Sequence, residues 1–361
     1  MKKILFETHH LYYWPNYLPV IEELKKRNGY LIEASMPVRS SKIEFNALKK
    51  MCNTLNIKFI ESGSEINRIR KIKSEGYDVI IVGNVGQLNK LVNNNTIAVM
   101  VYHGIGLKQS YYNDIDDRIN LRAVESSGRY KELRRLGHNN LVLTGFTKLD
   151  RLKTINKSEI KVVREKLDLS TNQKTVLFAP SFYPTSLELL YNEIKVLSKE
   201  CNVIIKLHAF SWEQSRYKYQ SKMYKKLSNE NKSITLLDNN IYDIIPYYKL
   251  ADLLISDISS TLFEFLPMDR PIIQASCFKL RFKHRIFNKR FIRKLDLTRL
   301  TNIDFSYKID NPSDLLSRVF YALENPKEMA DKRKIALVDY LYSFDGKASS
   351  RLIDSIEDYK N

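Results

Sequence analysis

The chain has 361 residues, of which 43% are hydrophobic, and carries a formal net charge of +18 at pH 7. This length is too great for one ordinary core and suits two domains, and the apolar content excludes a disordered chain. No run of eighteen apolar residues occurs, which argues against a membrane-spanning helix, while the excess of Lys and Arg predicts an anionic partner: a nucleic acid, an acidic membrane or a phosphorylated substrate.

The N-terminal sequence MKKILFETHH does not have the apolar core of a signal peptide, because its hydrophobic stretch stops at Glu7. Three cysteines, Cys52, Cys201 and Cys277, lie far apart without paired spacing. That spacing excludes both a disulfide framework and a CxxC metal knuckle. We therefore expect a cytoplasmic protein.

The first part of the chain alternates between strand-like and helix-like segments. Residues 2–8 (KKILFET) are typical of a buried strand, and residues 17–27 (YLPVIEELKKR) have apolar side chains at helical spacing. The alternation continues with strand-like runs at residues 30–35, 58–62, 77–83 and 96–104. Strands separated by helices of this length form a parallel sheet with both faces covered. We predict a doubly wound α/β domain.

A polar segment, residues 150–174, separates this part from a second alternating region. There, strand-like runs and helical segments follow one another at residues 174–182, 187–200, 202–210, 222–230, 233–238 and 252–257, before a helix that begins at Ser259. We predict a first domain at residues 1–160 and a second at residues 170–335. A C-terminal helical region, residues 336–361, is expected to cross back to the first domain.

Ligands of open parallel sheets bind at the carboxyl ends of the strands. His103 and Gly104 directly follow a strand-like run that ends at Tyr102. An imidazole there is able to take a proton near neutral pH, and a glycine allows the backbone to approach a ligand. On position alone, a histidine that merely caps a strand is the more common case.

A second candidate follows the run NVIIKLHAF, where Lys206 and His208 are two residues apart. Alternate residues of a strand share a face, so both side chains are expected on the same side of the strand end. Two potential cations side by side suit a phosphate or a developing negative charge. The alternative is an ordinary strand whose polar residues face solvent.

The third candidate is the stretch LLISDISSTLFEF, in which a carboxylate and three hydroxyls follow an apolar run. Ser259, Ser260 and Thr261 are expected at a helix N-terminus, where free N–H groups and the helix dipole attract phosphate. Asp257 would orient a neighbouring group or contact a ligand hydroxyl, and Glu264 would face the same cleft. Plain N-capping by a serine is the alternative.

Other polar groups are weaker candidates. Asp114, Asp116 and Asp117 include a DxD spacing that divalent metals use, although a solvated turn explains it better. His9 and His10 follow the first strand and either line a cleft or lie on the surface. Neither GxxxxGK[ST] nor GxGxxG occurs, so no phosphate or dinucleotide fingerprint is present.

The run from Lys279 to Lys294, KLRFKHRIFNKRFIRK, holds eight Lys or Arg in sixteen residues, interleaved with apolar side chains. Such a pattern suits an anionic bilayer, where each cation adds about 1 kcal/mol. It also fits a solvated helix with an apolar side. We expect no nucleic-acid partner, because no DNA- or RNA-binding motif accompanies the run.

Six motifs in order resemble the CDP-glycerol glycerophosphotransferase family of teichoic-acid primases and polymerases. They are HGxxxK (residues 103–108), TGFTKLDRL (144–152), VLFAPSF (176–182), IIKLHAF (204–210), ADLLISDISSTLFEF (251–265) and FDGKASSRL (344–352). The resemblance covers about residues 98–355. It implies a GT-B fold, in which two Rossmann-like doubly wound α/β domains face across a cleft and the final helix returns to the first domain.

The resemblance also implies roles for residues of these motifs. His103 would be the base that deprotonates the acceptor hydroxyl, with Asp257 as a second catalytic residue. The implied substrate-binding residues are Lys206, His208, Ser259, Ser260, Thr261, Glu264, Ser181, Gly104, Lys108 and Arg351.

The sequence departs from the family pattern at a few motif positions. Tyr102 replaces the usual tryptophan, Ile105 and Gly106 replace Thr-Pro, Ala209 replaces a proline, and Ile258 replaces an aromatic residue. The residues that bear the chemistry are present.

The implied activity is transfer of glycerol phosphate, or another polyol phosphate, from a CDP-activated donor to a hydroxyl of a lipid-linked or cell-surface glycan, with release of CMP. We expect no cofactor, although a divalent metal is not excluded, and a peripheral location at the inner face of the cell membrane. The alternatives are a GT-B glycosyltransferase that uses a nucleotide sugar, and a non-enzymatic basic protein that binds membrane or nucleic acid.

Overall fold

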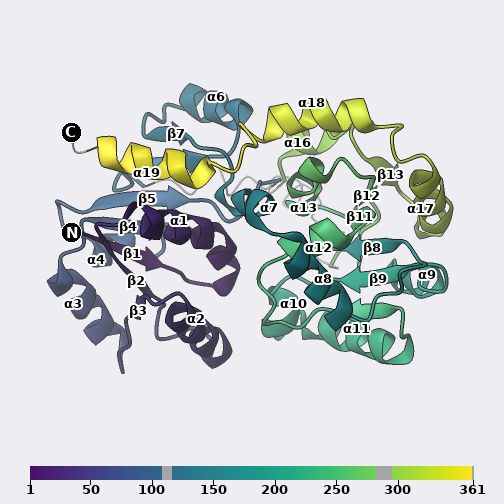
Figure 1. The fold of residues 1–361 in the computed structure, drawn as a ribbon, viewed down its shortest axis with the longest axis horizontal. Helices are drawn as coiled ribbons and strands as arrows, with labels where there is room; N and C mark the ends of the chain where they lie inside the picture. Colours follow the sequence, from purple (N-terminus) through teal and green to yellow (C-terminus); the bar gives the residue numbers. More distant parts are fainter. Residues whose placement is uncertain (108–115, 282–294, 360–361) are drawn as a thin grey trace. The chain divides into compact units, whose positions relative to one another are not determined.

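The structure, a computed structural model, describes residues 1–107, 116–281 and 295–359 (Figure 1). The chain forms two compact units. Unit 1 contains residues 1–104, 112–154 and 339–361, and unit 2 contains residues 105–111 and 155–338. Lys108, Asp114 and most of the basic run, residues 282–294, lie outside the described residues. No helix of the described part combines the length and the apolarity needed to cross a bilayer.

Unit 1 is built on a seven-stranded sheet in the order β3-β2-β1-β4-β5-β6-β7. The strands, all paired in parallel, are β1 (Lys2–Glu7), β2 (Tyr30–Ser35), β3 (Lys58–Phe59), β4 (Val79–Val82), β5 (Ile97–Val101), β6 (Leu121–Val124) and β7 (Leu141–Leu143). The strand order changes direction between β1 and β4, which is the topological switch point where such sheets bind ligands. β6 and β7 have four and three residues, too few to give a periodic signal in the sequence.

Helical segments of unit 1 connect these strands. They are η1 (Leu11–Tyr13), α1 (Trp14–Arg27), α2 (Lys42–Thr54), α3 (Glu65–Glu75), α4 (Leu88–Leu91), α6 (Ser127–Arg135), η2 (Thr147–Asp150), α7 (Arg151–Thr154) and α19 (Ala348–Asp358). The C-terminal helix α19 lies beside α1 (Figure 1), where Arg27 pairs with Asp354 at 2.7 Å and Glu357 at 3.1 Å. Residues at the two ends of the chain thus build one core.

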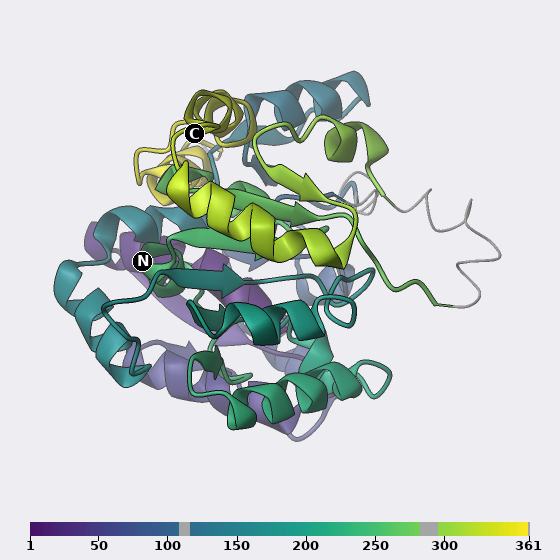
Figure 2. The ribbon, with the colours of Figure 1, turned by 90° about the vertical axis from the view of Figure 1, so that its right-hand side faces the viewer.

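Unit 2 contains a six-stranded parallel sheet in the order β10-β9-β8-β11-β12-β13. Its strands are β8 (Thr175–Phe178), β9 (Asn202–Ile205), β10 (Ile234–Leu236), β11 (Leu253–Ser256), β12 (Ile272–Ala275) and β13 (Tyr307–Ile309). The switch point of this sheet lies between β8 and β11. Figure 2 shows α17 (Leu315–Glu324) along the sheet, and its Leu315 and Val319 are fully buried in the core of the unit.

The other helical segments of unit 2 are mostly short. They are α8 (Lys157–Lys166), α9 (Tyr191–Leu197), α10 (Phe210–Glu213), α11 (Lys218–Glu230), α12 (Ile245–Leu250), α13 (Thr261–Glu264), η3 (Leu266–Met268), α16 (Leu297–Thr301), η4 (Pro312–Asp314) and α18 (Ala330–Tyr340). The helix predicted from Ser259 therefore has only four α-helical residues. Pro267, which has no N–H to donate, lies in the 3-10 turn that follows.

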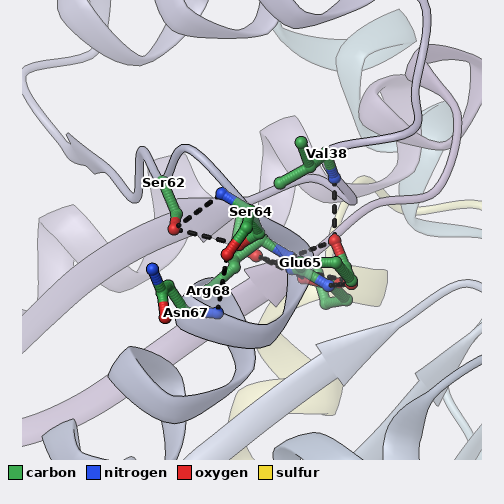
Figure 3. A network of polar contacts seen from close by, with 8 residues as sticks. Val38, Ser62, Ser64, Glu65, Asn67 and Arg68 are labelled. Carbon is green, nitrogen blue, oxygen red and sulfur yellow. Dashed lines mark hydrogen bonds and ion pairs between the residues drawn. The ribbon is translucent and has the colours of Figure 1, made fainter.

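A buried arginine fastens the carboxyl ends of β1 and β2. Arg68 of α3 donates to both carboxylate oxygens of Glu7, at 3.0 and 2.8 Å, and to the hydroxyl of Ser35. Its other nitrogens donate to Glu65, at 3.1 and 2.6 Å, and Glu65 accepts from the backbone N–H of Val38 (Figure 3). Since Arg68 and Glu7 are fully buried, each compensates the charge of the other.

Candidate functional site

Two loops are joined at the switch point of unit 2 by one carboxylate. Asp257, directly after β11, is fully buried. One of its oxygens accepts from the backbone N–H of Ser181 at 2.7 Å. The other accepts from the N–H of Ser186 at 3.0 Å and from the hydroxyls of Thr185 and Ser186, both at 3.1 Å. These bonds fix the loop that follows β8 against the end of β11.

The surroundings of Asp257 also decide its role. Burial raises the pKa of its carboxyl to about 6, and the hydrogen bonds from Ser181, Ser186 and Thr185 act in the opposite direction. Both oxygens are already bound by the chain itself, and the side chain has no exposed surface. The geometry therefore shows Asp257 positioning the loop after β8, and its predicted catalytic role stays a prediction.

The hydroxyls after β11 form a small network instead of a simple cap. Thr261 Oγ1 lies 2.7 Å from Ser256 Oγ, 3.1 Å from Ser259 Oγ and 3.1 Å from the carbonyl oxygen of Ala179. The backbone N–H of Thr261 donates to Ser259 Oγ at 3.4 Å. Because Ala179 follows β8, this network is a second connection across the switch point.

Ser260 occupies the N-cap position of α13 but makes no capping hydrogen bond with its side chain. Its hydroxyl donates instead to Glu264 at 2.7 Å, and Glu264 also accepts from Tyr248 at 3.0 Å. Glu264 is 1% exposed, so its carboxylate supports Ser260 and does not face a ligand as predicted. The backbone N–H groups of Ser259 and Ser260 donate to no residue that the structure describes, which leaves two donors at a partly exposed turn.

Lys206 and His208 lie just past β9, where the backbone N–H of Lys206 still donates to Phe178 of β8 at 3.0 Å and Leu207 between them is buried. Both side chains are partly exposed. The Lys206 ammonium donates to the carbonyl of Leu207 at 3.1 Å. His208 Nδ1 accepts from the N–H of Phe210 at 3.1 Å, and the imidazole packs 4.7 Å from the ring of Phe182.

Two cations of the basic run, Lys279 and Arg281, lie within the described residues of unit 2. The Arg281 guanidinium stands 4.1 Å from the ring centre of Tyr183 and 5.0 Å from that of Tyr217. Burial lowers the pKa of Arg281, and the neighbouring Arg216 acts in the same direction. Tyr183 lies in the loop fixed by Asp257, so the start of the run is packed on that loop.

In unit 1, His103 lies beyond β5 and packs on aromatic residues of η1. Its ring centre is 5.0 Å from that of Tyr12 and 4.6 Å from that of Tyr13. The amide of Asn16 donates to the backbone carbonyl of His103 at 3.4 Å. The imidazole is partly exposed and Gly104 after it is buried. His103 is therefore held at the strand end by ring packing.

Arg351 of α19 is engaged by its own unit. It donates to the carbonyl of Thr144 at 2.7 Å and to that of Ser343 at 3.2 Å, and it makes a bidentate pair with Asp345 at 3.0 and 2.8 Å. These contacts join the motifs TGFTKLDRL and FDGKASSRL. These contacts give Arg351 a structural role, and its predicted contact with substrate stays a prediction.

The same two motifs meet again at the start of α19. Asp150 accepts from the backbone N–H groups of Ala348 and Ser349, at 3.0 and 2.7 Å. Asp116, part of the DxD sequence, accepts from the N–H of Arg118 at 2.8 Å in a turn. That geometry matches the interpretation as a turn.

The predicted site residues that the structure describes divide between the two units. Unit 1 contains His103, Gly104 and Arg351, and unit 2 contains Ser181, Lys206, His208, Asp257, Ser259, Ser260, Thr261 and Glu264. The sequence analysis missed Thr185 and Ser186. Their signal was present, because both are hydroxyl residues in the loop after a buried strand.

Comparisons with known proteins agree with this architecture. The wall teichoic acid polymerase TagF superposes with a TM-score of 0.69 at 15% identity, over 99% of this chain and 89% of that one. An *S. aureus* MnaA structure with UDP has a TM-score of 0.68 at 15% identity, over 100% and 97% of the two chains. A putative UDP-N-acetylglucosamine 2-epimerase from *Listeria monocytogenes* has a TM-score of 0.64 at 14% identity, over 100% and 97%. A search of curated proteins found no match.

These likenesses establish the GT-B fold, with its two parallel-sheet α/β units. The family described as CDP-Glycerol:Poly(glycerophosphate) glycerophosphotransferase matches residues 93–358. That match spans well over half of the chain. The protein therefore belongs to the CDP-glycerol:poly(glycerophosphate) glycerophosphotransferase family and is an enzyme, a transferase of substituted phosphate groups.

Proposed function

We propose that the protein moves glycerol phosphate, or another polyol phosphate, from a CDP-activated donor to a hydroxyl of a lipid-linked or cell-surface glycan, and releases CMP. Membership of a family whose description names CDP-glycerol supports the donor. One of the similar structures is a TagF variant that was soaked with CDPG. We take this likeness as support for the same donor here.

The observation that carries the proposal is the turn after β11. Ser259 and Ser260 offer backbone N–H donors on a loop that Asp257 and Thr261 fix to the end of β8. Such donors, with the cation of Lys206, which follows β9 in the same sheet, suit the diphosphate of a CDP-polyol. Because α13 has only four residues, we assign the binding to individual donors and not to a long helix dipole.

In the proposed reaction His103 takes the proton from the acceptor hydroxyl. The acceptor oxygen then forms a bond to the phosphorus that carries the polyol, and the bond from that phosphorus to the bridging oxygen breaks. CMP leaves with the electron pair of that bond. Phosphoryl transfer needs little covalent help from the protein, because positioning and electrostatic stabilisation supply most of the rate.

A donor screen tests the proposal. The purified protein is incubated with a bacterial membrane fraction as acceptor and, separately, with CDP-glycerol, CDP-ribitol and a panel of UDP- and CMP-sugars. Acceptor-dependent release of CMP from a CDP-polyol is the expected result. Release of UDP from a UDP-sugar, with none of CMP from the CDP-polyols, would indicate a nucleotide-sugar transferase instead.

We also propose that the enzyme works at the cytoplasmic face of the membrane, where the run from Lys279 to Lys294 contacts anionic lipid. Most of that run lies outside the described residues, so the proposal depends on its composition. Co-sedimentation with phosphatidylglycerol vesicles should be strong at low salt and weak at high salt. Equal sedimentation with neutral phosphatidylcholine vesicles would contradict it.

A further inference from the structure

Three polar side chains gather at the switch point of unit 1, and we call them the switch-point cluster: His9, Asn16 and Asn84. His9 follows β1, Asn84 follows β4, and Asn16 belongs to α1. β1 and β4 are the two strands between which the sheet changes direction. The cluster therefore occupies the position in the sheet where open parallel α/β folds bind their ligands.

Contacts with Gly86, Tyr13 and His103 link the three side chains. A Cβ atom added at Gly86 would lie 2.5 Å from Nε2 of His9 and 2.8 Å from Oδ1 of Asn84, so Gly86 leaves both side chains room. The amide of Asn84 donates to the Tyr13 hydroxyl at 2.8 Å, and the ring of Tyr13 packs on His103. Asn16 donates to the His103 carbonyl. Through Tyr13 and Asn16, the cluster is thus in contact with His103, the proposed base.

Several hydrogen-bonding atoms of this cluster are buried without a partner. Both ring nitrogens of His9 and the Oδ1 atoms of Asn16 and Asn84 accept or donate nothing within the described residues. Asn16 is only 1% exposed. A buried polar atom that lacks its hydrogen bond costs about 1–3 kcal/mol. Several such atoms at one place indicate groups that a bound molecule completes.

The charge of the cluster restricts the chemical class of the molecule that it binds. Burial lowers the pKa of His9, which favours the neutral form of its imidazole. Of the two arginines that act electrostatically on His9, Arg68 is already neutralised by Glu7 and Glu65, and Arg39 has the smaller effect and is exposed. Amide oxygens and a neutral imidazole do not compensate a phosphate. They do match hydroxyl groups, which both donate and accept.

We propose that the switch-point cluster binds the hydroxyl-rich end of the acceptor, a polyol or a sugar, beside His103. The inference rests on the proposed function, because it assigns a ligand class to the acceptor side of that reaction. Each lost hydrogen bond to an uncharged hydroxyl should weaken acceptor binding about 3- to 10-fold.

The main test compares Asn84→Ala and His9→Ala with Asn94→Ala, an exposed asparagine after α4 that serves as the matched control. Initial rates of CMP release from CDP-glycerol are measured while the concentration of membrane acceptor or of donor is varied. We expect the acceptor KM to rise about 3- to 10-fold in both cluster variants, with the donor KM and the Asn94→Ala enzyme unchanged. An acceptor KM that stays at the wild-type value in a folded Asn84→Ala enzyme overturns the inference.

A second substitution separates hydroxyl from phosphate recognition. Asn84→Asp keeps an oxygen that accepts from a hydroxyl but adds a negative charge that repels phosphate. We expect its acceptor KM to stay closer to wild type than that of Asn84→Ala. A larger defect in Asn84→Asp than in Asn84→Ala would show that the cluster faces a phosphate and would overturn the ligand class.

Failure of the proposed function gives a different result. A wild-type protein that releases no CMP from CDP-glycerol removes that function, and the cluster is then tested by saturation-transfer NMR with a glycerol phosphate trimer as probe. Transfer to the polyol protons that is lost in Asn84→Ala supports the inference independently of turnover. Equal transfer in both proteins, or none in the wild type, overturns it.

Discussion

At the switch point of unit 2 the polar side chains satisfy one another, whereas at the switch point of unit 1 several polar side-chain atoms have no partner among the described residues. Asp257 receives four hydrogen bonds from the loop after β8, and Thr261 joins the same two strand ends. By contrast, ring nitrogens of His9 and amide oxygens of Asn16 and Asn84 are buried and unpaired.

The difference matches the two kinds of ligand that we propose for the two units. A loop that holds a charged diphosphate must be fixed in advance, since mobile donors would lose much of their electrostatic effect. A site for neutral hydroxyls is able to leave its hydrogen-bonding atoms open and let the ligand complete them. Substitutions in unit 2 should therefore cost stability, and substitutions around His103 should cost activity.

The largest effect is expected for His103→Ala. Loss of the proposed base should lower CMP release about 10²- to 10⁴-fold. Loss of the ring contacts with Tyr12 and Tyr13 should cost only about 1 kcal/mol of stability. Rates from the donor assay and urea denaturation measure the two effects. A folded variant with more than a tenth of the wild-type rate would remove the base assignment.

A pH series on Asp257→Asn tests the fixed loop of unit 2. The pKa of Asp257 is raised from 3.8 to about 6 in the folded protein, so its contribution to stability is complete below about pH 4 and is lost as the pH rises through 6. The shift corresponds to about 3 kcal/mol. The Asp257→Asn variant has no group that titrates at this position, and its amide N–H atoms face the N–H and O–H donors that surround Asp257. It should therefore be less stable than the wild type at pH 4. The difference in the free energy of unfolding between the two proteins should narrow by pH 7. Urea denaturation at pH 4, 5, 6 and 7 measures this gap; a gap that does not change with pH contradicts the prediction.

A smaller loss is expected for Ser260→Ala. The substitution removes one of the hydrogen bonds to the buried carboxylate of Glu264, which should lower the free energy of unfolding by about 1–2 kcal/mol. Ser317→Ala, at an exposed serine of α17, is the matched control and should change it by less than about 0.5 kcal/mol. Equal stabilities of the two variants would show that Ser260 does not support Glu264.

The smallest effect should be that of Asn84→Ala on stability. Because its amide oxygen is unpaired and only its amide nitrogen donates, to the Tyr13 hydroxyl, removal of the side chain should lower the free energy of unfolding by no more than about 1 kcal/mol. Chemical denaturation beside Asn94→Ala provides the measurement. A loss above about 1 kcal/mol would mean that Asn84 serves the fold and would weaken the contrast between the two switch points.

Strand ends were the most predictive feature of the sequence. His103, Asp257 and Ser259 were singled out because each follows an apolar run, and the structure places each just past a strand. Local pattern was sufficient for this, since strand and helix periods are properties of a few consecutive residues.

Hydrogen-bond partners were beyond the reach of that reasoning. The Ser181 N–H that binds Asp257 lies 76 residues away, and the carbonyl that Arg351 binds, that of Thr144, is 207 residues away. Such pairings depend on how the sheets fold, so a motif that looks like a ligand contact in sequence can be a structural one. Separation in the sequence also made the cluster of His9 and Asn84 impossible to predict, because the two residues come together only through the pairing of β1 with β4.

The bonds between Asp150 and the start of α19 tie the last part of the chain to unit 1, so unit 1 needs residues that are synthesised after all of unit 2. When residue 338 has been synthesised, every segment of unit 2 exists, but unit 1 still lacks residues 339–361. Domains fold as their segments emerge, so unit 2 should reach its native state first. Nascent chains halted between the two stages should resist protease in unit 2 while unit 1, which contains the proposed base His103, stays incomplete.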